Sequence, residues 1–397
     1  MDLSFGDADT AFRDEVRAFL ADRLTPDLMA AADRTVETYC EFEYGNRWLK
    51  ILAERGWGQP GWPVEWGGTG WSAVQHYIFN REVALAGAPR GFNNHPGSCI
   101  LGFGSDAQKA RFLPDILKVD TIWAQGYSEP AAGSDLASLV TSAVSDGDDY
   151  IVNGTKTWTT YAHRSDWLFC LVRTSREGRR QQGITFLLMD LGTPGIKIRP
   201  IINLAGQHDF NQVFFSDVRV PKANRVGAEN EGWTVAKYFL AFERLGSGAS
   251  RLLQRLDRVR RIIGLERAGE GGRLADDADV ARRLARIEVD LQALDTWELR
   301  FTSRLSRGEQ PGAEVSATKV LSANLMQRIT ELGMQALGYY GLPYEPDMLS
   351  AASNSRPAAP DYATAETLRY FMKRGETIYA GSDEVQRNIL AKRVLGL

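Results

Sequence analysis

The hydrophobic pattern of this chain changes its period twice, and that change limits the folds open to it. Apolar residues recur at helical spacing within residues 1–122, for example over Phe12–Leu20. Short runs of β-branched and aromatic residues replace them over 123–230, and helical spacing returns over 231–397. We therefore predict an α+β fold with an N-terminal helical domain (1–122), a central β domain (123–230) and a C-terminal helical domain (231–397).

Turn residues and helix breakers refine each predicted domain. The dipeptides Asp146-Gly147 and Asn153-Gly154 lie between β-forming runs and predict two tight turns. At least six short strands without intervening helices indicate a small barrel or sandwich. A short helix over 108–117 is expected to break near Pro114. In the last domain we expect a four-helix bundle, with helices over 233–264, 279–307, 313–337 and 364–374 and a short helix after Ser382.

Composition excludes several classes of function. The 397 residues carry 47 basic and 50 acidic side chains, so no basic excess indicates nucleic-acid binding. Arginines are dense over 251–286 but alternate with acids, which favours a solvated helix face. No apolar stretch is long enough to cross a bilayer, and the acidic N-terminus does not resemble a signal peptide. Three separated cysteines and four scattered histidines predict neither disulfides nor a metal site, so we expect a cytoplasmic protein.

Two neighbouring segments have the residues of a binding surface for a flat ligand. Residues 125–135 follow a predicted strand and are mostly small, with hydroxyls at Ser128 and Ser134. Small residues allow backbone N–H groups to approach a planar or anionic ligand closely. The strand over 156–160 then offers Trp158 and two threonine hydroxyls. Either segment alone is more often an ordinary turn or a core strand; together they describe a platform for a planar ring.

A carboxylate on an apolar helix face is the second candidate for chemistry. Val235, Phe239 and Phe242 mark the apolar face of a helix, and Glu243 lies one turn beyond Phe239. A carboxylate in that position is costly unless it is paired. A buried salt bridge to another helix and a catalytic base explain it equally well from these residues alone.

Three motifs resemble the acyl-CoA dehydrogenase family, and they occur in that family's order and spacing. Residues 127–135 (Tyr-Ser-Glu-Pro-x-x-Gly-Ser-Asp) resemble its flavin-loop signature, and 152–160 resemble the strand that follows. Residues 378–389 (Ile-Tyr-Ala-Gly-Ser-Asp-Glu-Val-Gln-Arg-Asn-Ile) resemble its C-terminal signature. Segments such as 75–79 and 166–170 are most similar to the large subunit of pimeloyl-CoA dehydrogenase and to actinobacterial steroid-type enzymes.

The resemblance implies FAD-dependent α,β-dehydrogenation of an acyl-CoA thioester in lipid metabolism. Glu243 would remove the α-proton while the β-hydrogen leaves as hydride to flavin N5. Ser134, Arg244 and Gly381 would contact the substrate. The residues implied in FAD binding are Gln125, Tyr127, Ser128, Gly133, Ser134, Trp158, Thr159, Thr160, Gln335, Ser382 and Glu384.

Two departures from the family pattern concern the base and the FAD pyrophosphate. Many members carry the base in the C-terminal loop, where this chain has Ala380; a subset carries it in a Glu-Arg pair, as in Glu243-Arg244. No Arg-x-x-Phe-Gly segment follows Leu265, and the usual Gln-x-x-Gly-Gly segment loses a glycine at Tyr339. The adenine end of the FAD site is therefore expected either to be altered or to be completed by a different subunit.

Partners and alternatives follow from the same resemblance. It implies an electron-transfer flavoprotein or a similar acceptor, and either a homo-oligomer (dimer or tetramer) or a heterotetramer with a related chain. The alternatives are a flavin-dependent oxidase or monooxygenase on the same fold and a non-catalytic partner subunit.

Overall fold

The computed structural model describes residues 5–36, 38–243, 248–269, 271–309 and 312–397, and the side chains of residues 240–243 fall outside this description. The chain divides into two compact units. One comprises residues 1–48, 70–92 and 244–397, which we call the bundle unit; the other comprises 49–69 and 93–243, which we call the sheet unit. Segments 49–69 and 93–122 of the predicted N-terminal domain thus pack with the β domain.

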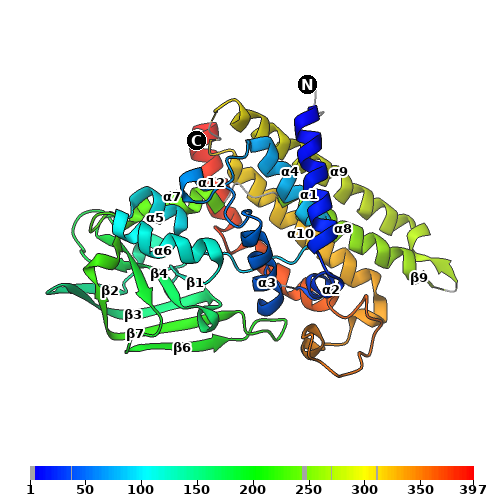
Figure 1. The fold of residues 1–397 in the computed structure, drawn as a ribbon. Coiled ribbons are helices and arrows are strands. Elements are labelled where there is room, and N and C mark those ends of the chain that lie inside the picture. Colours follow the sequence, from blue (N-terminus) through cyan, green and yellow to red (C-terminus); the bar gives the residue numbers. More distant parts are fainter. Residues whose placement is uncertain (1–4, 37, 244–247, 270, 310–311) are drawn as a thin grey trace. The chain divides into compact units, whose positions relative to one another are not determined.

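The sheet unit is built on a mixed sheet of eight strands in the order β6-β7-β3-β2-β4-β5-β8, with β1 parallel to β4. The helices α5 and α6 lie together on one side of it (Figure 1). The strands are β1 (Trp123–Gly126), β2 (Ser142–Asp146), β3 (Asp149–Thr160), β4 (Trp167–Arg173), β5 (Ile184–Asp190), β6 (Ile196–Ile201), β7 (Phe210–Pro221) and β8 (Arg225–Val226). The helices are α5 (Gly97–Phe103), α6 (Asp106–Lys118) and α7 (Gly232–Glu243).

Strand β4 is buried on both faces and separates two hydrophobic cores. Phe169 and Leu171 belong to the core shared with α5, α6 and α7. Leu168, Cys170 and Val172 belong to the core formed with β2, β3 and β7. Because side chains alternate along a strand, a continuous apolar run supplies both cores at once. The central β-sheet domain predicted from the sequence is confirmed.

The sequence predictions of a turn at Asn153-Gly154 and of a helix break near Pro114 are both wrong. The dipeptide Asn153-Gly154 is not a turn but a bulge within the continuous strand β3, where pairing with β7 shifts after Val152. The glycine is needed because a Cβ on Gly154 would lie 2.6 Å from the Thr141 hydroxyl. Helix α6 also runs through Pro114, because a capping box between Ser105 and Gln108 and several buried apolar side chains stabilise it.

The bundle unit consists mainly of helices, of which α8, α9 and α10 share one apolar core. Long helices α8, α9 and α10 lie side by side in it (Figure 1). Its helices are α1 (Asp7–Arg23), α2 (Pro26–Arg34), α4 (Ala73–Leu85), α8 (Gly248–Leu265), α9 (Ala278–Ser306), α10 (Val315–Ala336), α11 (Glu366–Lys373) and α12 (Asp383–Leu390), with a hairpin of β9 (Arg267–Ala268) and β10 (Gly272–Arg273). Helix α3 (Phe42–Glu54) spans the boundary between the units. The helix predicted over 233–264 corresponds to α7 and α8, and its residues 244–247 lie outside the described residues.

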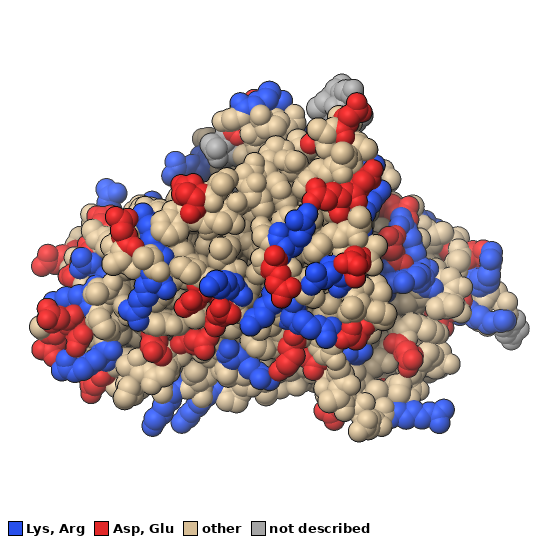
Figure 2. Space-filling model, viewed as in Figure 1, with Lys and Arg blue, Asp and Glu red and all other residues tan. Residues whose placement is uncertain are grey.

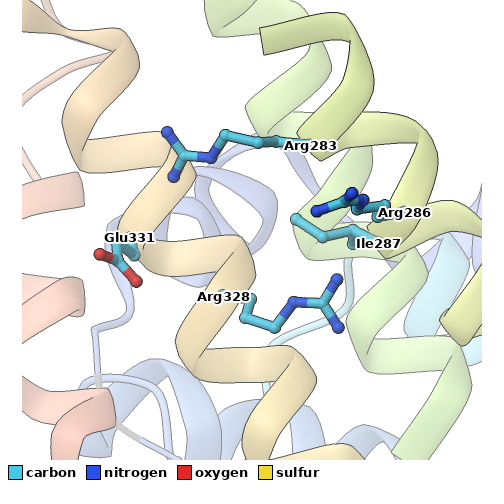
Figure 3. Close-up of a pocket in the computed structure, with 5 residues that line it drawn as sticks. All are labelled: Arg283, Arg286, Ile287, Arg328 and Glu331. Carbon is cyan, nitrogen blue, oxygen red and sulfur yellow. The ribbon is translucent and has the colours of Figure 1, made fainter. Parts of the chain in front are cut away.

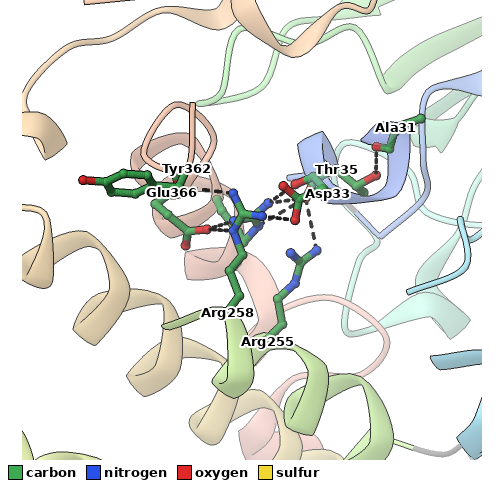
Figure 4. A network of polar contacts seen from close by, with 8 residues as sticks. Ala31, Asp33, Thr35, Arg255, Arg258, Tyr362 and Glu366 are labelled. Atoms are coloured by element: carbon green, nitrogen blue, oxygen red, sulfur yellow. Dashed lines mark hydrogen bonds and ion pairs between the residues drawn. The ribbon is translucent and has the colours of Figure 1, made fainter. Parts of the chain in front are cut away.

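The arginine-rich segment is only partly a solvated face, because α8 directs Arg258 into the interior of the bundle unit. Arg258 and Arg369 both pair with the fully buried Glu366 of α11. Arg258 also pairs with Asp33 at the end of α2. The guanidinium groups of Arg369 and Arg255 donate to the carbonyl of Thr35, the residue that follows α2 (Figure 4). Cations placed at a helix C-terminus are stabilised by its dipole, so this network ties α2 to α8 and α11.

Charge is mixed on the surface, with Lys and Arg interspersed among Asp and Glu on the face shown in Figure 2. None of the helices in the described ranges has the length and apolar character needed to span a membrane. Within the same ranges, no group of three or more His, Cys, Asp and Glu side chains is placed to hold a metal ion.

We predict that Glu366→Gln lowers the free energy of unfolding by about 3–5 kcal/mol, because it removes the buried carboxylate that the Arg258 and Arg369 guanidinium groups share. Urea unfolding measures this change. The matched control is Glu288→Gln. Its half-exposed carboxylate pairs with Arg260, which lies on α8 like Arg258, and removing this carboxylate should change stability little. Equal effects of the two substitutions would contradict the role given to Glu366.

Candidate active site

A buried ion pair attaches the loop after β1 to strand β3. The Lys156 side chain is fully buried, and its Nζ lies 2.8 Å from Oε1 of Glu129. The same ammonium group donates to the carbonyl of Tyr127 at 3.1 Å. The backbone N–H of Thr157 donates to the carbonyl of Ser128 at 2.9 Å. Together these contacts fix the small-residue loop against the strand.

The carboxylate of Glu129 also holds the far end of this loop. It accepts hydrogen bonds from the backbone N–H groups of Val140 and Thr141 at 2.7 and 2.9 Å. Burial alone would raise the pKa of Glu129, but the Lys156 ammonium and these hydrogen bonds outweigh it and lower the pKa. Glu129 is therefore a charged structural group at neutral pH.

Trp158 has a strained backbone and an exposed ring. Its φ is +59°, in the left-handed region that bulky residues rarely adopt, and pairing with β7 is interrupted between Lys156 and Thr159. Its side chain is 60% exposed, with its ring edge-on to Phe210 at 6.0 Å. Strain of this kind persists only where the surrounding structure enforces it, and it is common at ligand sites.

The two threonines after Trp158 differ in their environment. Thr159 is buried, and its Oγ1 has no hydrogen-bond partner among the described residues. Thr160 is half-buried and ends β3 opposite Phe210. A buried hydroxyl without a partner is costly and indicates a missing ligand or water.

The remaining predicted loop residues line the same part of the sheet unit. The Tyr127 ring is buried against Phe169 and Phe239. Gln125 in β1 accepts a hydrogen bond from Asn94 at 3.4 Å. Gly133 and Ser134 are exposed, and the space next to Gly133 is open.

Helix α7 brings the candidate base towards this loop. A Cβ on Gly232 would lie 2.6 Å from the backbone of Phe186, so the first turn of α7 sits directly on β5. Phe239 on its buried face lies 6.3 Å from the Tyr127 ring, measured between centroids. Glu243 is the last residue of α7, one turn beyond Phe239. Its side chain is among those outside the description, and Arg244 lies outside the described residues altogether.

The other predicted residues belong to the bundle unit. Ala380 and Gly381 have φ of +54° and +85°, and the Ser382 hydroxyl then caps α12 by accepting from the N–H of Val385. Glu384 is exposed in the first turn of α12, where hydrogen bonds from its own N–H and from the Ser382 hydroxyl lower its pKa. Gln335 near the end of α10 is exposed and donates to Glu331 at 3.3 Å. Gly381, Ser382 and Glu384 are thus brought together on one turn, whereas Gln335 lies on a different helix.

Family models match three consecutive parts of the chain. They are the acyl-CoA dehydrogenase N-terminal domain (residues 6–120), middle domain (124–218) and C-terminal domain (230–395). The chain belongs to the acyl-CoA dehydrogenase family. Members are flavoproteins, and this chain is accordingly an oxidoreductase that acts on acyl-CoA thioesters.

Similar proteins extend over almost the whole chain. Acyl-CoA dehydrogenase IpdE1 of Mycobacterium tuberculosis is 39% identical over 393 residues, which cover 97% of each chain. Acyl-CoA dehydrogenase FadE26 of the same organism is 34% identical, covering 100% of this chain and 99% of that one. The crystal structure of the ChsE4-ChsE5 complex from M. tuberculosis contains a chain that is 34% identical, with a TM-score of 0.82 over 100% of this chain and 99% of that chain. A structure described as the Tcur3481-Tcur3483 steroid ACAD is 30% identical, with a TM-score of 0.82 and the same coverage.

The residues of the sheet unit fit the flavin of this family. The unpartnered Thr159 hydroxyl, the exposed Trp158 indole and the open space at Gly133 all lie on the loop and strand joined by the Glu129–Lys156 pair. They offer a hydrogen-bond donor, an aromatic surface and room for close approach to a flat ring. These are the properties that a flavin requires of its site.

A pocket of about 210 Å³ lies elsewhere, on the bundle unit between α9 and α10 (Figure 3). Arg328 on α10 pairs with Asp290 at 2.5 Å, and Glu331 accepts from Gln335. No predicted site residue lines this pocket. It is formed by Arg283, Arg286, Ile287, Arg328 and Glu331.

The sequence did not single out the residues that fix the loop. Nothing in the local sequence distinguishes Glu129 as a structural group, because an acid in a polar loop is usually solvated. A lysine in the middle of an otherwise apolar and hydroxylated strand was the available signal, since such a side chain is rarely buried without a partner.

We predict that Lys156→Met lowers the free energy of unfolding by about 3–5 kcal/mol, because Glu129 is left buried and unpaired. The double variant Lys156→Met, Glu129→Gln should recover part of this loss, since no unpaired charge remains. Thermal and urea unfolding measure both. Arg219→Met, which removes an exposed ion pair with Asp146 on the same sheet, should change stability little. A double variant less stable than Lys156→Met would argue against the ion pair.

Proposed function

We propose that this protein binds FAD and catalyses α,β-dehydrogenation of an acyl-CoA, with Glu243 as the base that removes the α-proton. The observation that carries the proposal is the loop joined to β3 by the Glu129–Lys156 pair, beside the exposed Trp158 and next to the helix that ends at Glu243. The proposal assigns FAD to Gln125, Tyr127, Ser128, Gly133, Ser134, Trp158, Thr159 and Thr160, with Gln335, Ser382 and Glu384 from the bundle unit.

Each protein group has a separate task in the proposed reaction. The Glu243 carboxylate takes the α-proton, and the electron pair of that C–H bond forms the new double bond as the β-hydrogen leaves. Bound FAD would supply the acceptor for that hydrogen, as hydride at N5. Ser134, Arg244 and Gly381 orient the thioester. Hydrogen bonds to its carbonyl oxygen stabilise the charge that develops as the proton leaves.

The environment of Glu243 determines how well it can act. A general base must be unprotonated at working pH, yet basic enough to take a carbon-bound proton. Exclusion of water by substrate raises the pKa of a carboxylate and makes it a stronger base. Val235 and Phe239, which are buried on the same helix, support such a setting for Glu243.

The similar structures extend the proposal to the acyl group and the assembly. One is described as a steroid ACAD, so we propose a ring-bearing acyl-CoA as the substrate class. Another is a complex of two differently named chains. The departures at the pyrophosphate segment support a neighbouring chain, identical or related, that completes the FAD site. Electron-transfer flavoprotein is the proposed acceptor.

We predict that Glu243→Gln slows flavin reduction by a ring-bearing acyl-CoA at least about a hundredfold, the usual contribution of a positioned general base. The glutamine keeps the shape but cannot take the proton, so FAD content should stay at the wild-type level. Anaerobic stopped-flow absorbance measures the rate. Glu231→Gln, at an exposed glutamate just before α7, is the control and should react normally. An undiminished rate in Glu243→Gln would remove Glu243 from the reaction.

The same assay separates the alternative activities. An acyl-CoA dehydrogenase turns over with an artificial acceptor and reacts slowly with oxygen, whereas an oxidase turns over with oxygen alone. A protein with bound FAD that no acyl-CoA reduces would be a non-catalytic partner subunit.

We predict that the protein is an oligomer, because large side chains are exposed after α10. Tyr339 is 89% and Leu342 is 73% exposed, and obligate interfaces cover such residues. Mass photometry with flavin quantitation is the measurement. We expect one FAD per chain in an active homo-oligomer; protein without FAD that becomes active only with a related chain would establish the heteromer. A monomer with full FAD content and activity would contradict the prediction.

A further inference from the structure

Two of the four histidines stack on each other beside the end of strand β3. His163 lies in the single turn of 3-10 helix at Ala162–Arg164, directly after β3. His208 lies in the loop that leads into β7. Their ring centroids are 3.8 Å apart and the planes differ by 16°. Both side chains are half-buried, and none of the steps proposed above uses them.

The amide of Asn211 determines whether the ring nitrogen that faces it carries a hydrogen in each histidine. Asn211 is fully buried in β7, and its Nδ2 lies 3.0 Å from the carbonyl oxygen of Thr159. Because a carbonyl only accepts, this contact sets the orientation of the amide. The second N–H of Nδ2 faces Nδ1 of His163 at 3.1 Å, so that nitrogen must be unprotonated. The amide oxygen lies 2.7 Å from Nε2 of His208, so that nitrogen must carry a hydrogen.

This network holds a strained piece of backbone. Trp158 and Tyr161 both have positive φ, at +59° and +49°. Left-handed backbone costs an L-residue about 1–2 kcal/mol, so contacts from outside the strand must maintain it. Residues 209–211 supply them. The carbonyl of Asp209 accepts from the N–H of Tyr161 at 2.8 Å, and the next two residues contact the Trp158 ring and the Thr159 carbonyl.

We propose that Asn211 is a positioning residue for the Trp158–Thr160 strand end, and that the His163–His208 stack makes this hold sensitive to acid. The inference rests on the proposed function, in which that strand end contacts the flavin. Protonation of Nδ1 of His163 would remove the acceptor for the Asn211 amide. It would also place a cation against the face of His208.

The surroundings of His163 determine in which direction, and over which pH range, the Asn211 network responds to acid. Burial, then the neighbouring His208, then the Arg164 guanidinium lower the pKa of His163 to about 4. The Tyr161 ring lies 6.0 Å from the His163 ring, measured between centroids, and the buried carboxylate of Asp209, next to His208 in the chain, accepts a hydrogen bond from Asn203 at 2.7 Å. A histidine released from the network has a pKa of about 6.5. Above that pH His163 is neutral both within the network and when released from it. Between about pH 6.5 and pH 4 the released histidine binds the proton, so the Asn211 network becomes less stable as pH falls.

Histidine side-chain NMR tests the network without reference to flavin. With only four histidines, labelled His163 and His208 can be assigned by single substitutions. We expect His163 to be neutral, with the hydrogen on Nε2, down to about pH 5. Asn211→Ala should remove this preference for one tautomer and raise the pKa of His163. A wild-type His163 that titrates near its ordinary pKa, or that carries its hydrogen on Nδ1, would overturn the inference.

FAD retention in the loaded protein tests the consequence. Wild-type affinity for FAD should fall about tenfold or more between pH 7 and pH 5. His163→Gln keeps an acceptor but cannot be protonated, so its affinity should change less over this range. Asn211→Ala should weaken FAD binding by about tenfold already at pH 7. His76→Gln, in the bundle unit, is the control and should retain the wild-type pH dependence.

The two measurements separate the inference from the function on which it rests. The same pH dependence in His163→Gln as in the wild type, or unchanged FAD affinity in Asn211→Ala, would overturn the positioning role. A wild-type protein that takes up no FAD, either alone or together with a related chain, would overturn the proposed function and the flavin part of this inference. The NMR result still decides whether the Asn211 network exists.

Discussion

The buried pair of Glu129 and Lys156 is the interaction on which the candidate site depends. A charged pair without solvent is costly, and further hydrogen bonds support it here: the carboxylate accepts from two backbone N–H groups and the ammonium donates to a carbonyl. The pair therefore does more than offset its own desolvation. It converts a loop of small residues, which has little packing of its own, into a fixed surface beside β3.

Fixing that surface also determines where strain can be stored. Lys156 is held on the buried side of β3 by its ion pair, and two residues later Trp158 adopts left-handed backbone with its ring exposed to solvent. The segment 209–211 then holds the strand end from the other side. Residues 156–160 are therefore held by three features that follow one another along the strand. These are the Glu129–Lys156 ion pair, the bulge at Trp158 and the hydrogen bonds of the Asn211 amide. The chemistry proposed for Glu243 needs this order, because a base is effective only against a substrate whose position is fixed.

Much of the fold could be predicted from the sequence, because helical and strand periodicities are local signals. The helices expected over 279–307 and 313–337 differ from α9 and α10 by one or two residues at each end. The predictions at Pro114 and Gly154 are wrong for different reasons. A capping box and buried side chains allow α6 to continue through Pro114, and Gly154 is required by the close approach of Thr141 and not by a turn. Motifs single out Trp158 and Glu243 as candidates, because each residue type differs from its neighbours in the sequence. The Asn211 network could not be predicted, because its partners are 48 and 52 residues away in the chain and no local pattern records their meeting.

The two bulges in β3 restrict insertions and deletions in this strand. Between Val152 and Gly154, and again between Lys156 and Thr159, the register against β7 shifts, so which face a side chain occupies depends on how many residues precede it. Lys156 and Thr159 face inwards and Trp158 faces out only at the present spacing. Gaining or losing one residue between the bulges would exchange the faces and expel the lysine from its carboxylate. The length of β3 between its bulges is therefore fixed: an insertion or deletion there would displace Lys156, Trp158 and Thr159 together, whereas a substitution changes only one of them.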